Sequence, residues 1–148
     1  MSPAMRAACA IALFALAGCS GRPERALLVP GPPRAVPYAE LIAQTPLAPG
    51  ENIHVRELER GDSSSLSLVQ IRDREQPHVH TRYDLTVTLA EGWGTLWLDG
   101  TSLPMHPGST VFIPKGTPHY FVNQGSAPAA ALVMFAPPFS GPDQAPVP

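Results

Sequence analysis

Hydrophobic and polar residues alternate over short stretches in the middle of the chain, and this pattern predicts an all-β fold. Runs rich in β-branched, aromatic and aliphatic residues are separated by turn-forming residues; they cover 53–60, 66–72, 85–90, 95–98, 109–114, 119–123 and 129–135. Asp99-Gly100 stands between two short strands and indicates a two-residue hairpin, because both central positions need a positive φ. We therefore expect a small sandwich or barrel over residues 51–136.

The first eighteen residues have the features of an export signal. Arg6 precedes the apolar run Ala7–Leu16, which is too short to span a bilayer and is typical of a signal-peptide core. The run ends in Leu16-Ala17-Gly18-Cys19, which resembles the lipobox of bacterial lipoproteins. The resemblance implies a signal peptide over residues 1–18, a lipid on Cys19, and a membrane-anchored protein at the periplasmic face of the outer membrane. An ordinary secretory signal with a chance cysteine is the alternative, and either Met1 or Met5 is the start.

Proline marks the regions on either side of the predicted barrel. Seven prolines lie between Ser20 and Gly50, so residues 19–50 are expected to form a polyproline-type tether. The stretch Tyr38–Gln44 is free of proline and is expected to allow a short helix docked on the domain. Residues 137–148 are again rich in proline and predict a C-terminal tail outside the barrel, held by Phe135 and Phe139.

Composition narrows the class of protein. A chain of 148 residues that is 44% hydrophobic and 15% charged fits one folded domain rather than a disordered protein. A formal net charge of −2 gives no reason to expect nucleic acid as a partner. Two cysteines cannot build a disulfide framework.

Three histidines form the strongest chemical signal in the sequence. His78 and His80 are two residues apart, so on a strand both imidazoles point to the same face and lie close enough to bind one metal ion. His119 follows the turn Lys115-Gly116-Thr117-Pro118, which brings it back across the sheet.

The segments around these histidines resemble the two motifs of the cupin family. Five residues match every position of the second motif, G-x5-P-x-G-x2-H-x3-N: Gly108, Pro114, Gly116, His119 and Asn123. His78, His80 and Gly92 match the first motif, G-x5-H-x-H-x3,4-E-x6-G. The resemblance implies a double-stranded β-helix, or jelly-roll barrel, with a metal held inside by His78, His80 and His119.

Two positions depart from the first motif. Arg72 stands where the motif has its leading glycine, and Leu85 stands where it has glutamate, with Asp84 one residue earlier. Alternation puts Leu85 and Asp84 on opposite faces of their strand, so Asp84 is a fourth metal ligand only if a bulge turns it inward.

The remaining candidates concern the metal and the pocket. Three neutral imidazoles suit Zn, Fe, Mn, Ni or Cu and leave positions open for a small molecule. Gln70, Tyr83 and Tyr120 are the candidate pocket residues. His54 and His106 are expected to face solvent, and Arg72-Asp73-Arg74-Glu75 is expected to be a solvated loop, since its charges alternate in sign.

These observations favour a lipid-anchored envelope protein whose cupin barrel binds a divalent metal and a small-molecule ligand. A metal-dependent enzyme of the dioxygenase or isomerase type is one alternative. A metal-free envelope scaffold or binding protein is another, and cupins often pair as homodimers through an edge strand.

Overall fold

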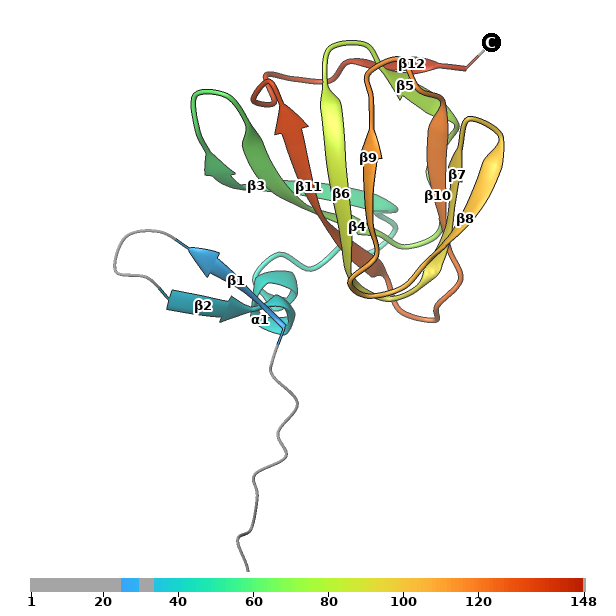
Figure 1. The fold of residues 1–148 in the computed structure, drawn as a ribbon. Coiled ribbons are helices and arrows are strands. Elements are labelled where there is room, and N and C mark those ends of the chain that lie inside the picture. Colours follow the sequence, from blue (N-terminus) through green and yellow to red (C-terminus); the bar gives the residue numbers. More distant parts are fainter. Residues whose placement is uncertain (1–24, 30–33, 148) are drawn as a thin grey trace, which may run out of the picture.

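Two antiparallel sheets of five strands each form the body of the protein in the computed structural model, which describes residues 25–29 and 34–147. The first sheet contains, in spatial order, β3 (Ile53–Arg60), β4 (Ser65–Ile71), β11 (Ala129–Ala136), β6 (Asp84–Glu91) and β9 (Thr110–Ile113). The second contains β12 (Gln144–Pro146), β5 (His78–His80), β10 (His119–Asn123), β7 (Gly94–Leu98) and β8 (Thr101–Met105). The chain passes repeatedly from one sheet to the other, as Figure 1 shows, and the all-β prediction is confirmed.

The core lies between the two sheets because the inward side chains of both are apolar. Leu85 and Leu89 from β6 pack in one cluster with Leu96 from β7 and Phe121 from β10. Period-two alternation explains this arrangement, since every second residue of each strand faces the interior. The same alternation points the histidines of β5 and β10 into the barrel.

Two turns of the barrel require residues that tolerate a positive φ. Asp99 and Gly100 both have a positive φ, as expected for a tight hairpin between β7 and β8. Gly92 has φ +84°, and a Cβ at this position would lie 2.9 Å from the Cα of Ala129. The glycine of the first motif is therefore required where β6 approaches β11.

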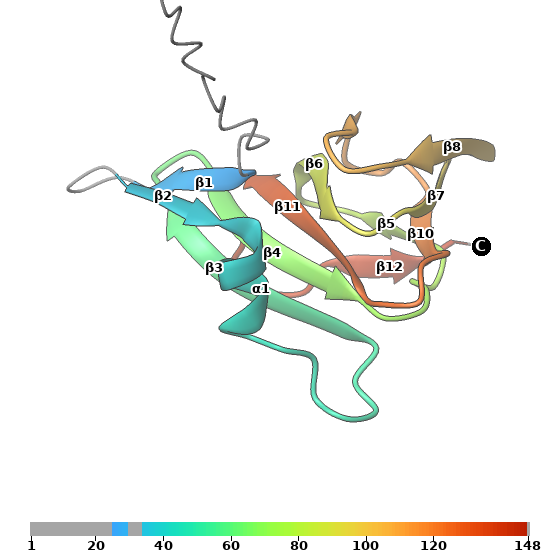
Figure 2. The same cartoon turned by 90° about the horizontal axis from the view of Figure 1, so that it is seen from below.

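The described part of the expected tether is folded onto the barrel. It forms the hairpin β1 (Ala26–Val29) and β2 (Arg34–Pro37), followed by the helix α1 (Tyr38–Ala43), which confirms the short helix. Val36 and Leu41 are buried against the outer face of the first sheet, where they contact a cluster that includes Leu68, Ala130 and Leu132. Figure 2 shows α1 beside β4. Pro37 occupies the N-cap position of α1, where its missing backbone N–H removes no hydrogen bond of the helix.

The expected tail is also part of the fold. Residues 144–146 form β12 and pair with β5, with Gln144 opposite His80 and Pro146 opposite His78. Because β12 is the edge strand of its sheet, a proline is tolerated there. The barrel therefore extends beyond residue 136, and the predicted boundary at that residue needs correction.

No helix in the described ranges is long and apolar enough to cross a membrane. The proposed signal peptide and Cys19 lie outside the described residues.

The contact between α1 and the first sheet makes a testable prediction. Leu41→Ala should lower the free energy of unfolding by about 2 to 4 kcal/mol, because it removes a buried side chain and leaves a cavity. Urea unfolding measures the change. Leu28→Ala is the control, since Leu28 is 75% exposed, and its stability should match that of the unmodified protein. Equal stability of both variants would mean that this segment does not fold with the barrel.

Candidate metal centre

The three histidines predicted from the sequence meet inside the barrel. His78 and His80 come from β5, and His119 lies directly opposite His78 in the β5–β10 pair. One ring nitrogen from each lies within 4.8 Å of the corresponding atoms of the other two. All three side chains are buried, so water does not surround them.

Each imidazole is oriented by a hydrogen bond from its Nδ1 atom. Nδ1 of His78 donates to the carbonyl of Gln76 at 2.7 Å, and Nδ1 of His119 donates to the carbonyl of Thr117 at 2.8 Å. Since a carbonyl only accepts, Nδ1 carries the proton, and in the neutral ring Nε2 then keeps its free electron pair. This is the arrangement that metal-binding histidines usually have.

A repeated local sequence produces two of these hydrogen bonds. Both histidines follow a proline, in Gln76-Pro77-His78 and Thr117-Pro118-His119. Proline favours an extended conformation in the residue before it, and in both tripeptides that residue offers its carbonyl to the histidine ring. The X-Pro-His pattern thus fixes the tautomer without help from distant residues.

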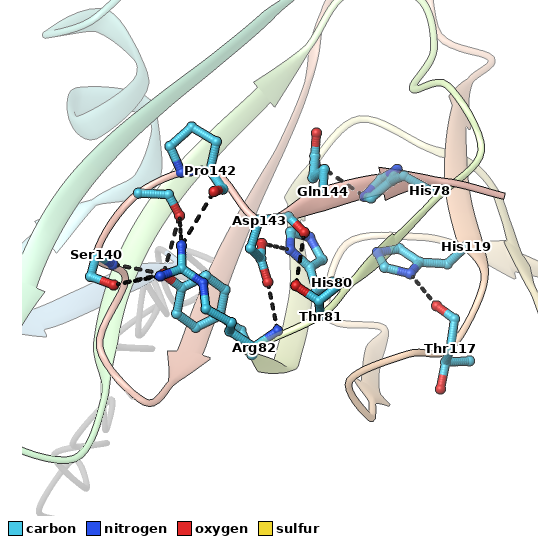
Figure 3. A network of polar contacts seen from close by, with 12 residues as sticks. His78, His80, Thr81, Arg82, Thr117, His119, Ser140, Pro142, Asp143 and Gln144 are labelled. Carbon is cyan, nitrogen blue, oxygen red and sulfur yellow. Dashed lines mark hydrogen bonds and ion pairs between the residues drawn. The ribbon is translucent and has the colours of Figure 1, made fainter.

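His80 is oriented by a residue far away in the sequence. Its Nδ1 lies 2.6 Å from Oδ1 of Asp143, whose Oδ2 accepts the backbone N–H of Arg82 at 2.8 Å (Figure 3). Burial alone would raise the pKa of Asp143, but the hydrogen bonds from His80 and Arg82 hold this pKa below its usual value. The carboxylate therefore stays charged and keeps the proton of His80 on Nδ1.

Burial keeps His80 and His119 neutral. It lowers the pKa of His119 to about 4, although the hydrogen bond to Thr117 opposes the shift. Burial also lowers the pKa of His80, and the hydrogen bond to Asp143 counteracts part of this effect. Neutral imidazole is the form that binds metal, so both rings are in the binding form at neutral pH.

A cavity of about 350 Å³ adjoins the histidines. His80 and His119 form part of its wall, and most of the remaining wall is apolar, with side chains from both sheets such as Val69, Leu96 and Phe121. Its other polar residues are Glu75, Asp143 and Gln144. The site therefore combines one polar end with an apolar interior, as small-molecule sites commonly do.

Glu75 is one of three cavity residues that sequence reasoning missed, the others being Asp143 and Gln144. It was expected in a solvated loop, but it lines the cavity, and its carboxylate accepts the backbone N–H of Phe121 at 2.8 Å. Burial raises the pKa of Glu75, while the nearby His78 and the N–H of Phe121 oppose this shift. No local pattern marks Glu75, because its partner is 46 residues away along the chain.

Asp84 does not join the histidines. Its carboxylate accepts the backbone N–H of Lys115 at 2.9 Å, and the cluster of potential ligands does not include it. Its neighbour Leu85 faces the cavity, so no bulge turns Asp84 inward. The structure thus gives no support to Asp84 as the fourth ligand.

The three predicted pocket residues lie outside the cavity wall. The side-chain amide of Gln70 donates to the carbonyl of Thr45, which follows the C-terminal end of α1. Tyr83 is buried but uses its hydroxyl to bind the backbone of Ser140 and Gly141. Tyr120 stacks against Trp97 at a centroid distance of 6.0 Å.

The two other described histidines are outside the cluster, as expected. His106 is exposed, and His54 is half-buried with its Nδ1 2.8 Å from a carboxylate oxygen of Glu51.

Comparisons with known proteins agree with this architecture. The family model described as a cupin domain matches residues 66–135. An uncharacterized protein of Aquifex aeolicus is 37% identical over 93 residues, which are 63% of this chain and 76% of that protein. TT1209 from Thermus thermophilus has a similar structure, with a TM-score of 0.59 at 24% identity over 67% of this chain and 95% of that chain. A variant of Streptomyces PAC13 with uridine gives 0.55 at 20% identity, over 66% and 79% of the two chains. The motifs, the sequence relative and the fold together show that this chain belongs to the cupin superfamily.

Proposed function

We propose that this protein binds one divalent transition metal through Nε2 of His78, His80 and His119, and that a small molecule occupies the adjoining cavity. The observation that carries the proposal is the meeting of three buried histidines whose Nδ1 atoms each face a carbonyl or carboxylate oxygen, so that in the neutral rings the Nε2 atoms are free to bind metal. Zn, Fe, Mn, Ni and Cu all accept such a ligand set. When bound, the metal would supply a Lewis acid with positions open to the small molecule.

The cavity restricts what this molecule can be. Its wall is mainly apolar, so a ligand that fits gains free energy by burying hydrocarbon, at about 25 cal/mol per Å². Its polar groups gather near the histidines, which favours one oxygen-bearing group at that end. We propose a small, largely apolar molecule with a single carboxylate, carbonyl or hydroxyl group.

Metal analysis tests the proposal. The purified protein should bind one equivalent of Zn²⁺ at neutral pH, measured by titration against a chromophoric chelator. His78→Ala and His119→Ala should each weaken binding by about 100-fold or more, because each removes a ligand.

His106→Ala is the matched control, since His106 is exposed and lies outside the cluster. Its affinity should equal that of the unmodified protein. Absence of stoichiometric binding, or an equal loss in the His106 variant, would refute the proposed metal site.

Glu75 supports a second candidate, a metal-dependent enzyme. General acid–base chemistry is favoured by a carboxyl group with a raised pKa at the substrate, and Glu75 is half-buried in the cavity wall with this property. Solved structures with this fold include PAC13, described as a nucleoside dehydratase. We propose that, if the cavity performs catalysis, Glu75 holds or accepts the proton.

If Glu75 has a raised pKa in the folded protein, its charged form should lower the stability of the fold at neutral pH. A raised pKa means that the folded state disfavours the charged form, so stability falls as the pH rises above the unfolded value of 4.5. Glu75→Gln should therefore raise the melting temperature at pH 7, while Glu59→Gln, on an exposed position of β3, should leave it unchanged. A lower melting temperature for Glu75→Gln would mean that the charged carboxylate of Glu75 stabilises the fold. It would contradict the proposal that Glu75 acts as an acid or base in an enzyme.

Anchoring to the envelope is a separate proposal. It rests on the sequence alone, namely the apolar run Ala7–Leu16 and the lipobox-like Leu16-Ala17-Gly18-Cys19. A lipid on Cys19 would hold the barrel at the periplasmic face of the outer membrane.

A further inference from the structure

We infer that Gln144, from the C-terminal strand β12, supplies the fourth protein ligand of the metal through its side-chain oxygen. The inference rests on the proposed three-histidine site and deepens it. It also accounts for Leu85 at the position where the first motif has glutamate.

The register of β12 brings Gln144 to the histidines. Gln144 pairs with His80 across the β12–β5 ladder. Directly opposed residues of an antiparallel pair point to the same face, so the amide of Gln144 extends on the histidine side of the sheet. Its Nε2 lies 3.2 Å from Nε2 of His78, the nitrogen that is free to bind metal (Figure 3).

Metal binding at Nε2 of His78 favours a rotation of the Gln144 amide that exchanges the positions of its Oε1 and Nε2 atoms. Because His78 carries its proton on Nδ1, the amide of Gln144 donates to Nε2 in the metal-free protein. The oxygen and nitrogen of an amide have nearly the same shape, so a half-turn of the group puts Oε1 where Nε2 was. Donor atoms around one metal at about 2.1 Å are about 3.0 to 3.4 Å apart, and the distance of 3.2 Å fits.

Hydrogen bonds join residues 141–143, which precede Gln144, to His80 and Arg82. Asp143 binds both His80 and the backbone N–H of Arg82. The guanidinium of Arg82 donates to the carbonyls of Gly141 at 2.9 Å and Pro142 at 3.2 Å. These contacts hold the residue next to Gln144 in place, so the amide stays near the site although its side chain is exposed.

Within residues 25–29 and 34–147, no carboxylate joins the three histidines in the ligand cluster. Asp84 binds Lys115 instead, and Glu75 is outside the ligand cluster and held by Phe121. With three imidazoles and one amide, every protein ligand is neutral, and the metal keeps its full positive charge. Such a centre favours an anionic ligand at the open position, such as a carboxylate.

Cobalt is the probe for this inference, because the visible absorption of Co²⁺ reports its ligands. Gln144→Ala should weaken Co²⁺ and Zn²⁺ binding by about tenfold or more and change the Co²⁺ spectrum. Gln144→Glu should restore or strengthen binding, since a carboxylate oxygen replaces the amide oxygen. Asp84→Asn is the matched control and should alter neither the affinity nor the spectrum. The melting temperature of each metal-free variant separates lost binding from lost folding.

Three outcomes distinguish the possibilities. Unchanged or tighter binding in Gln144→Ala, with an unchanged spectrum, would show that the amide only caps His78, and would overturn the inference. A loss in Asp84→Asn with none in Gln144→Ala would assign the fourth ligand to Asp84 and also overturn it. Absence of metal binding by the unmodified protein would instead refute the proposed function.

Discussion

The hydrogen bonds on the three Nδ1 atoms are the interactions on which the rest of the site depends. They decide which nitrogen of each ring carries the proton, and so which nitrogen is available to a metal. Two of them are made within X-Pro-His tripeptides, with carbonyls two residues before His78 and His119. The third joins His80 to Asp143, 63 residues away. Local geometry therefore fixes two ligands, and only the complete fold fixes the third.

This dependence explains why the C-terminal segment belongs to the barrel. A buried polar group without a partner costs about 1 to 3 kcal/mol, and Asp143 satisfies His80 while Arg82 and Tyr83 bind the chain just before it. The same segment closes part of the cavity wall. Its orienting aspartate, Asp143, immediately precedes the proposed fourth ligand, Gln144, so one short segment serves both purposes.

The parts of the structure that local patterns determine were predictable from the sequence. Alternation identified the strands, and the glycine and proline spacing around His119 identified the second motif. Alternation also explains why Gln70 and Tyr120 miss the cavity, because Val69 and Phe121 beside them face it. Glu75, Asp143 and Gln144 could not be found in this way, since their partners lie 46, 63 and 66 residues away along the chain. Proline content misled at both ends, because prolines at helix starts and on edge strands are compatible with folded structure.

Nitrogen NMR of the imidazole rings in the metal-free protein reports directly on this arrangement of protons, because it distinguishes the two tautomers and follows protonation. We predict that the neutral rings of His78, His80 and His119 carry their proton on Nδ1, and that His119 stays neutral until the pH approaches about 4. Protons on Nε2 at pH 7, or a titration of His119 near its ordinary value of 6.5, would contradict it.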